Sequence, residues 1–393
     1  MPHRFILPSY FFLCGFFLRK IFDPFLKRLY TVFNQYVLIY VDKNVNEVSF
    51  VALEKNRAVT QNDVAREAGV TRSMVSYVIS GSNARSVAPE TRERILQAIE
   101  KLGYRPNKAA QELQQGKEAF AKKQIGVVLC DANVFLRPYY AEIVSGIHTA
   151  AHENKFDVHF IHFFDELRDP VLFNRIIHPE EIGSLILVAT KHAIRNDSDL
   201  KLIEAIKEKI PQIVCVEWKC DGLTSVTFDL QETARKAASY LFSKGYEDVA
   251  YIGEEDERVA GVRLAFIENG IAGPGDGQVV PAFTMEGGFY GAKTLEEKRG
   301  FPRAIVCGSD EVAIGVLCYL NEKKIKIPEE VAVISIDNIE SAAFTTPPLT
   351  TMNVQKRAMG VRAVEMIVGG TALQGDKSLC ISLPTSIVER SSC

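Results

Sequence analysis

The sequence predicts a small all-α helix-turn-helix domain followed by an α/β body of two doubly wound lobes. Residues 60–102 have the pattern of short helices separated by turns, whereas residues 124–337 alternate apolar strands with helical stretches. Such alternation is typical of parallel sheets covered by helices. The number of strands in the second region favours two lobes over one.

The distribution of charge supports the same division. Residues 57–123 contain 12 Lys/Arg and 7 Asp/Glu, and residues 1–56 contain 7 and 4, whereas residues 124–393 contain 27 and 38. A basic module on an acidic body is expected when one domain meets polyanionic DNA and the other does not.

The expected elements of the body follow one another closely. The strands are 125–130, 157–163, 184–189 and 213–218 in a first series, and 225–229, 249–254, 278–284, 304–309 and 331–337 in a second. Helices are expected at 139–154, 199–209, 231–244, 288–298 and 311–323.

The first 56 residues form an extension with an apolar stretch at 5–18. This stretch is too short for a comfortable membrane span, and no small-residue cleavage site follows it. A membrane anchor or signal sequence, a cytosolic extension and a mis-assigned start are the alternatives. We favour the mis-assigned start, because residues 57–65 have the pattern of a new domain start, and so we expect no stable membrane association. No Met lies between Met1 and Met74, so the hypothesis requires a non-Met start codon near Val51 or Leu53.

The 8 cysteines show no repeated spacing and no CxxC pair, and several lie in apolar runs. Reduced thiols pack there as small hydrophobic groups, which indicates a cytoplasmic protein. The histidine pairs and the run GPGDG at 273–277 lack the context of a metal site or a phosphate-binding loop. We therefore expect no metal, no cofactor and no enzymatic activity.

Capping signals define the helices of the N-terminal module. Thr60 is a good N-cap with Asp63 three residues later, and Gly69 permits a tight turn before a second helix at 72–80. Pro89 begins a third helix that ends at Gly103. Two short helices with a supporting third are typical of a helix-turn-helix unit, although an ordinary helical bundle is the alternative.

The runs VTQNDVAREAGVTRSMVSYVISG (59–81) and VAPETRERILQAIEKLGYRPNKAAQEL (87–113) resemble the DNA-binding domain of the LacI/GalR family. The resemblance extends over about residues 57–390 and implies a sequence-specific transcriptional repressor whose partner is double-stranded operator DNA. It places the helix-turn-helix at 57–104, a hinge helix and linker at 105–123, and an effector-binding domain at 124–390. The first lobe is expected at 124–223 and 353–382, and the second at 224–352 and 383–390.

By this resemblance, the helix 72–80 is the recognition helix. Arg72, Ser73 and Tyr77 match positions that reach base edges in the major groove. The candidates for phosphate contacts are Thr60, Thr71, Ser76 and Asn83. In the hinge, Lys108 and Ala109 would lie along the groove and Leu113 would enter the minor groove, while a solvated linker is the alternative.

Ligands of open α/β sheets bind at the carboxyl ends of strands, so the cleft between two lobes is the expected effector site. Asp131 follows the first strand, and Tyr139 and Tyr140 begin the next helix. The resemblance adds three residues, Arg258, Phe283 and Asp310. Their structural alternatives are a local ion pair for the arginine, a core position for the phenylalanine and a helix cap for the aspartate.

An arginine, a carboxylate and an aromatic face together suit a polyhydroxylated ligand, so we expect a carbohydrate effector, with a purine as the alternative. The chain ends without a leucine-heptad tail, and two operator half-sites require two modules, so we expect a homodimer. A membrane-retained solute-binding protein is the alternative from another class; the helix-turn-helix and hinge argue against it.

Overall fold

The computed structural model describes residues 59–80, 87–104, 121–275, 277–372 and 374–393. The chain forms two compact units that divide between Asn107 and Lys108. The N-terminal extension, Asn83 and the hinge residues Lys108, Ala109 and Leu113 lie outside the described residues. Within the described part, none of the helices has the length and apolar character needed to cross a membrane.

The first unit contains the helices α3 (Gln61–Ala68), α4 (Arg72–Ser80) and α5 (Pro89–Leu102), as the sequence predicts. At the start of α3, the backbone N–H of Thr60 donates to the Asp63 carboxylate at 2.9 Å, and Gly69 ends the helix with a φ of 64°. Seven buried side chains form its core: Val64, Ala65, Ala68, Val75, Val78, Ile95 and Ala98. Met74 of α4 lies outside this core and is 40 % exposed.

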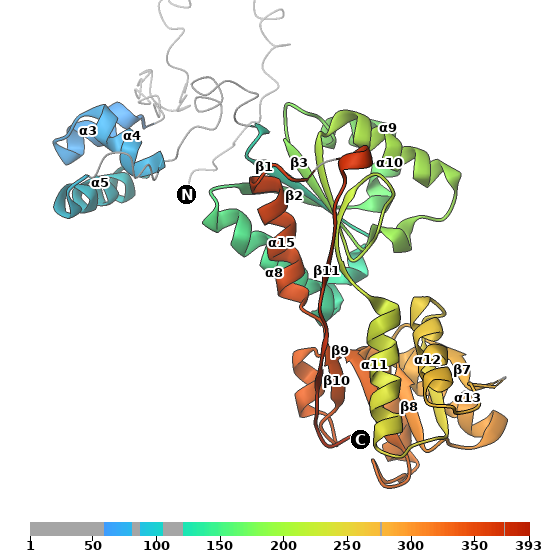
Figure 1. Ribbon diagram of the computed structural model, residues 1–393. Coiled ribbons are helices and arrows are strands. Elements are labelled where there is room, and N and C mark those ends of the chain that lie inside the picture. The colour runs from blue at the N-terminus through green and yellow to red at the C-terminus, as the bar shows by residue number, and fades with distance from the viewer. Residues whose placement is uncertain (1–58, 81–86, 105–120, 276, 373) are drawn as a thin grey trace, which may run out of the picture. The chain divides into compact units, whose positions relative to one another are not determined.

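The second unit is an α/β body with two six-stranded sheets (Figure 1). The first sheet has the order β11-β5-β4-β3-β1-β2 and defines the N-lobe. Its strands are β1 (Gln124–Leu129), β2 (Asp157–Phe163), β3 (Ser184–Val188), β4 (Gln212–Val216), β5 (Thr224–Phe228) and β11 (Cys380–Leu383). Neighbouring strands in this sheet are parallel.

The second sheet has the order β12-β10-β9-β8-β6-β7 and defines the C-lobe. Its strands are β6 (Val249–Gly253), β7 (Val279–Pro281), β8 (Ala304–Cys307), β9 (Ala332–Asp337), β10 (Thr350–Asn353) and β12 (Ser386–Val388). Only the β10–β12 pair is antiparallel. Central strands such as β3, β8 and β9 are buried throughout, as expected of sheets covered on both faces.

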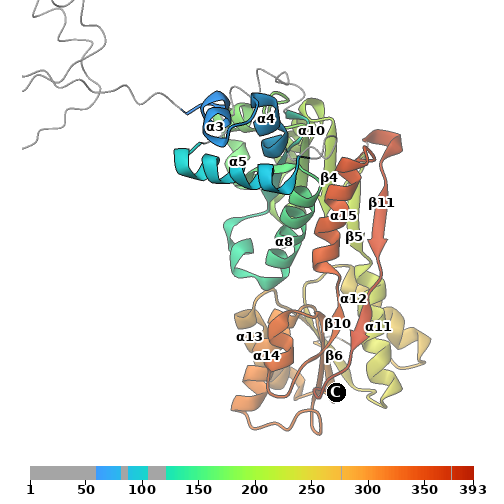
Figure 2. The ribbon, with the colours of Figure 1, turned by 90° about the vertical axis from the view of Figure 1, so that its left-hand side faces the viewer.

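Helices cover both sheets (Figure 2). The N-lobe helices are α8 (Pro138–Glu153), α9 (Pro170–Ile176), α10 (Asp197–Lys209) and α15 (Lys356–Val368). The C-lobe helices are α11 (Leu230–Ser243), α12 (Glu257–Glu268), α13 (Met285–Arg299) and α14 (Asp310–Glu322). The short 3₁₀ helices are η2 (Ala132–Leu136), η3 (Phe164–Arg168), η4 (Thr190–Ala193), η5 (Glu340–Phe344) and η6 (Gly375–Lys377).

The strand β5 corrects one sequence-based expectation. Residues from 224 onward were assigned to the second lobe, but β5 lies in the N-lobe sheet between β4 and β11. Val216 pairs with Val226, and the Glu217 N–H donates to the Val226 carbonyl at 2.9 Å. Parallel neighbours usually require a crossover helix, and residues 217–223 contain none. No sequence signal therefore indicates that β4 and β5 are adjacent. The chain first passes between the lobes after β5.

Glycines allow the N-lobe helices α8 and α15 to lie side by side (Figure 1). A Cβ atom on Gly360 would lie 2.2 Å from the carbonyl oxygen of Ile143, and one on Gly146 would lie 2.2 Å from that of Arg357. The backbones of the two helices are therefore in direct contact, and no larger residue fits at either position.

We predict that Gly360→Ala lowers the Tm by at least about 3 °C, because the added methyl group overlaps a carbonyl that cannot move without displacing α8. Gly287→Ala in α13 is the matched control, since its Cβ would meet only ordinary contacts of 3.4 Å or more. Alanine is the better helix former, so the control should keep or raise the Tm. Equal effects of the two substitutions would contradict the packing argument.

Candidate nucleic-acid interface and effector cleft

The helix α4 presents its predicted DNA-binding side chains on its outer face. Arg72 and Ser73 are exposed, and Ser76 and Tyr77 are half-buried, while Val75 and Val78 pack into the core. The Nε of Arg72 donates only a long bond of 3.4 Å to Gln61. The spacing of these residues therefore gives α4 one polar face and one core face, the arrangement that a recognition helix needs.

Two predicted phosphate-contact residues cap helices of this unit. The Thr60 hydroxyl donates to the Asp63 carboxylate at 2.6 Å, and the exposed Thr71 hydroxyl accepts from the Met74 N–H at 3.4 Å. Both residues precede helix N-termini, where backbone N–H groups and the helix dipole favour an anion. Their assignment to DNA phosphates remains a prediction.

In the body, a cleft lies between the two lobes, where loops follow the carboxyl ends of the strands. The N-lobe contributes Arg137, Tyr139, Tyr140, His192 and Glu217. The C-lobe contributes Glu254, Arg258, Ala282, Phe283, Gly308, Ser309, Val312 and Asp337. The side chains of both lobes reach across the cleft and leave about 30 Å³ of free space. This volume holds about one or two water molecules. A larger ligand must displace some of these side chains.

Four of the six predicted ligand-binding residues line this cleft together: Tyr139, Tyr140, Arg258 and Phe283. Phe283 is 42 % exposed, so it is not a core residue. Arg258 does make the local ion pairs considered as its alternative, with Glu254 and Asp256, yet it also faces the cleft.

Asp131 and Asp310 do not line the cleft. Asp131 is exposed, and its carboxylate accepts from the Asn133 N–H at 2.7 Å to cap η2. Asp310 is 0 % exposed. Its carboxylate accepts from the hydroxyls of Ser335 at 2.5 Å and Thr351 at 2.6 Å and from the Ile339 N–H at 2.7 Å.

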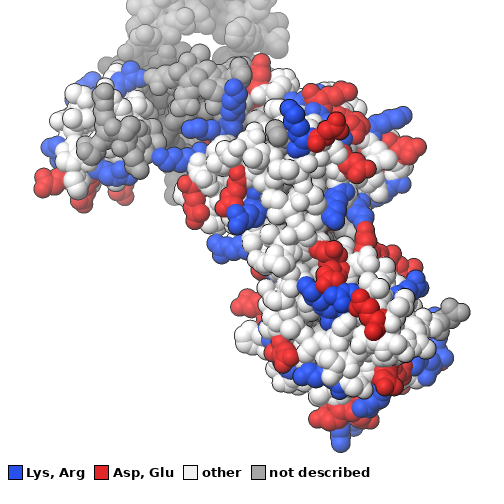
Figure 3. Space-filling model, in the orientation of Figure 1, with Lys and Arg blue, Asp and Glu red and all other residues white. Residues whose placement is uncertain are grey.

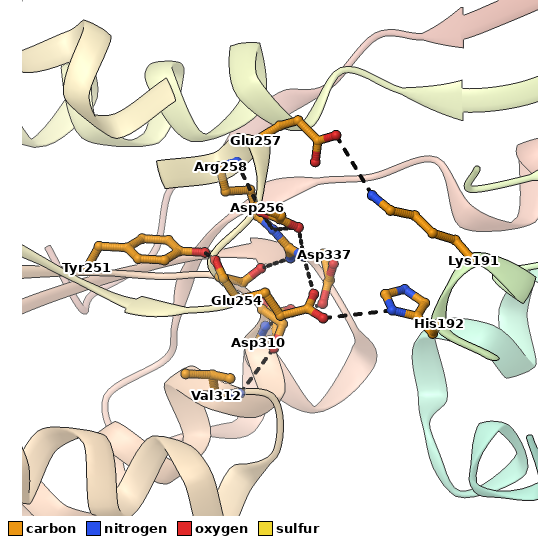
Figure 4. Close-up of polar contacts among 12 residues, drawn as sticks. Lys191, His192, Tyr251, Glu254, Asp256, Glu257, Arg258, Asp310, Val312 and Asp337 are labelled. Atoms are coloured by element: carbon orange, nitrogen blue, oxygen red, sulfur yellow. Dashed lines mark hydrogen bonds and ion pairs between the residues drawn. The ribbon is translucent and has the colours of Figure 1, made fainter. Parts of the chain in front are cut away.

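The role of Asp310 is therefore corrected: it connects the ends of C-lobe strands beneath the cleft. Burial raises the pKa of this carboxyl to about 6, although its hydrogen bonds oppose the shift. Of these two neighbouring aspartates, Asp337 at the end of β9 is the one whose side chain lines the cleft (Figure 4). Burial and the charge of Asp310 raise the pKa of Asp337 as well.

Sequence reasoning missed five ionisable residues of the cleft: Arg137, His192, Glu217, Glu254 and Asp337. Glu217, Glu254 and Asp337 directly follow or end the strands β4, β6 and β9, so the rule that ligands bind at strand ends could have found them. Arg137 immediately precedes the helix α8 and His192 lies in the short helix η4, and neither position carries such a signal.

The arginines of the cleft already have partners. Arg258 Nη1 donates to the Gly308 carbonyl at 2.6 Å, and Nη2 contacts the carboxylates of Asp256 at 2.7 Å and Glu254. Arg137 reaches from the N-lobe to Glu311 of the C-lobe at 2.5 Å. Its guanidinium also lies 4.1 Å from the centre of the Phe283 ring, a cation–π contact between the lobes.

Two longer contacts also cross the cleft. Lys191 and His192 of η4 extend toward Glu257 and Glu254 of the C-lobe, at 3.8 and 3.9 Å (Figure 4). Burial lowers the pKa of His192, which favours its neutral form.

Two buried oxygen atoms of the cleft, Tyr139 Oη and Glu217 Oε2, have no hydrogen bond of good geometry among the described residues, although the two side chains lie close enough to interact with each other. Burial raises the pKa of Glu217 to about 7. Buried polar atoms are nearly always paired in folded proteins, so both oxygens can accept a further hydrogen bond from a ligand. No group of three or more potential metal ligands occurs among the described residues.

The fold and the cleft define a protein with a helix-turn-helix module and a two-lobed binding domain. Residues 60–107 match the model of the bacterial regulatory proteins of the lacI family, and residues 238–393 match a periplasmic binding protein-like domain. The chain belongs to the LacI family of DNA-binding transcriptional regulators. This confirms the fold class and the family predicted from the sequence.

Curated relatives support this membership. The chain is 27 % identical over 342 residues to the HTH-type transcriptional repressor PurR of Erwinia tasmaniensis, an alignment covering 85 % of this chain and 96 % of the relative. The PurR of Histophilus somni is also 27 % identical, with coverage of 85 % and 98 %. These relatives are transcriptional regulators, as was predicted here in preference to an enzyme.

Solved structures share the fold. A Lac repressor bound to ONPG in the repressed state has a TM-score of 0.65 and 22 % identity, and the match covers 86 % of this chain and 100 % of the repressor chain. A transcriptional regulator CelR–cellobiose complex has a TM-score of 0.59 and 24 % identity, with coverage of 85 % and 100 %.

We predict that Glu217→Gln raises the Tm of the ligand-free protein at pH 8 by about 4 °C or more and changes it little at pH 5. The folded-state pKa of about 7 lies above the ordinary value of 4.5. The folded state therefore loses stability as pH rises from 4.5 through 7, and the neutral amide removes that loss.

Thermal unfolding at both pH values measures this effect. Glu208→Gln is the control, because Glu208 is exposed on α10 and lies outside the cleft lining. A Glu217→Gln effect of the same size at pH 5 and pH 8 would contradict the proposed cost of ionising Glu217.

Proposed function

We propose that the protein is a cytoplasmic homodimeric repressor whose operator affinity is changed by a carbohydrate bound between the two lobes. The observation that carries the proposal is the composition of the cleft: arginines and carboxylates from both lobes, with the exposed face of Phe283. Such groups suit the vicinal hydroxyls and the apolar face of a sugar ring. The solved relative named as a cellobiose complex is in agreement with a sugar.

A purine effector is the second candidate, because the curated relatives cited above are named PurR. The cleft offers more hydrogen-bond acceptors than a purine base has N–H donors. Glu217, Glu254 and Asp337 contribute carboxyl groups to its wall, and Tyr139 adds a buried hydroxyl. A polyhydroxylated ligand supplies enough O–H donors for this set, which is why we favour a sugar.

The contacts across the cleft suggest how ligand binding would change operator affinity. A ligand that contacts Arg137 on one lobe and Arg258 on the other competes with existing contacts such as the Arg137–Glu311 pair. It therefore has different affinities for different arrangements of the lobes, the condition for changing a conformational equilibrium. In the dimer, this change would separate the hinge helices or bring them together.

We predict that Arg72→Ala weakens binding to an operator selected from random DNA by about 1–3 kcal/mol and relaxes the base preference at one position of each half-site. Arg94→Ala is the matched control, since Arg94 is exposed on α5 and carries the same charge. It should leave base preference unchanged. Fluorescence anisotropy with the selected operator and its single-base variants measures both quantities; identical preferences for wild type and Arg72→Ala would remove Arg72 from the base contacts.

We predict that at least one neutral sugar, amino sugar or sugar phosphate raises the Tm of the full chain and changes operator affinity at least about fivefold. Phe283→Ala should weaken this response, because the ring forms an exposed wall of the cleft. Purine bases and nucleosides are tested in parallel. A purine response without a sugar response would replace the carbohydrate proposal, and sugar binding with no change in operator affinity would contradict the coupling.

A further inference from the structure

The cleft and the residues directly behind it contain more acidic than basic groups. Six carboxyl groups are buried or half-buried there: Glu217, Glu254, Asp256, Asp310, Glu311 and Asp337. Three cationic groups accompany them: Arg137, Arg258 and Lys356. On the face of the body that Figure 3 shows, charges of both signs are interspersed. In the cleft, the surplus carboxyl groups are withdrawn from solvent, where an unneutralised charge is costly.

The three cationic side chains already form ion pairs or hydrogen bonds with groups other than the Glu217 carboxylate. Arg258 pairs with Asp256 and Glu254, and Arg137 pairs with Glu311. Lys356 is 2 % exposed. Its ammonium donates to the backbone carbonyls of Asp337 at 2.6 Å and Asn338 at 3.1 Å and lies 3.4 Å from Glu142.

Three of the six carboxyl groups, Glu217, Asp310 and Asp337, make no ion pair among the described residues. Asp310 is buried behind the cleft, whereas Glu217 and Asp337 line it, as does Tyr139. The oxygens Glu217 Oε2 and Tyr139 Oη are buried, and apart from the interaction of these two side chains with each other they have no hydrogen-bond partner in the described part of the chain. A buried carboxylate is costly unless a proton, a metal ion or another cation neutralises it. The described residues offer no cluster suited to a metal ion, which leaves a proton or a cationic ligand.

We propose that the effector is an amino sugar and that its protonated amino group binds against Glu217, Tyr139 and Asp337. This inference rests on the proposed function and narrows its ligand class. An ammonium group has three N–H donors and no acceptor, which matches a wall of two carboxylates and a hydroxyl. The ligand's positive charge would compensate the buried Glu217 carboxylate, which has no ion pair among the described residues. A neutral sugar offers hydroxyl donors but no such charge.

The test is isothermal titration of the full chain at pH 7 with matched sugars. The probes are D-glucosamine, D-galactosamine and D-mannosamine, each against the parent hexose and the N-acetyl derivative. Within each set, only the amino sugar carries a positive charge at the substituted carbon. The N-acetyl derivative has a nitrogen at the same carbon but no charge, so it separates the effect of the charge from that of the nitrogen atom. We expect one amino sugar to bind at least about tenfold more tightly than both of its neutral counterparts.

Substitutions assign the preference to the proposed wall. Glu217→Gln, which keeps the shape and removes the charge, should abolish the tenfold preference, and Tyr139→Phe should reduce it. Glu208→Gln, which changes an exposed carboxylate of α10 outside the cleft lining, should leave the preference intact. Circular dichroism and thermal unfolding establish that each variant is folded before titration, and Tyr139→Phe provides the test if Glu217→Gln does not fold.

The outcomes separate this inference from the proposed function. A neutral sugar that binds as tightly as its amino form overturns the amino-sugar inference and leaves a carbohydrate-responsive repressor. An amino-sugar preference that survives in Glu217→Gln overturns the assignment to this wall. Binding of purine bases without any sugar overturns both the inference and the carbohydrate proposal, as does the absence of binding by all the sugars.

Discussion

Arg137 and Glu311 form a buried ion pair that joins the two lobes of the body, with 2.5 Å between Nε and Oε2. Arg137 lies immediately before α8, and Glu311 lies in the first turn of α14. The pair brings together the edges at which the strands of both sheets end. Since removal of one partner from a buried pair leaves an uncompensated charge, such contacts constrain geometry strongly. The width of the cleft depends on this contact and on the stacking of Arg137 over Phe283.

Packed elements connect the cleft to both lobes. Lys356 begins the N-lobe helix α15 and binds the carbonyl of Asp337, whose side chain lines the cleft from the C-lobe. Close contact at Gly360 then joins α15 to α8, and the first turn of α8 contains Tyr139 and Tyr140. A group that binds to either wall therefore acts on elements in direct contact with the other wall, which is the physical basis required for coupling.

Local signals made much of the fold predictable. The capping residues and turn glycines of the helix-turn-helix, and the apolar strands of the body, depend on neighbours a few residues away. The placement of β5 did not follow from the sequence, because its pairing with β4 lacks the usual crossover helix.

The position of the candidate site was predictable from local signals, but the orientation of its side chains was not. The strand-end rule located the cleft, but both Asp310 and Asp337 lie at strand ends. Which carboxyl faces the ligand depends on Ser335 and Thr351, which bind Asp310 and hold it in the core. The contact between Arg137 and Glu311 joins residues 174 positions apart, and no local pattern marks it.

The central claim is that contacts across the cleft control operator affinity. Its most direct test is fluorescence anisotropy of the full chain and Glu311→Gln with the selected operator. Asp199→Asn is the control. Like Glu311, Asp199 is a buried carboxylate paired with an arginine, but its partner Arg168 lies in the same lobe. We predict that Glu311→Gln changes operator affinity at least about fivefold, whereas Asp199→Asn does not. Unchanged operator affinity in Glu311→Gln, with the variant folded, would contradict the claim.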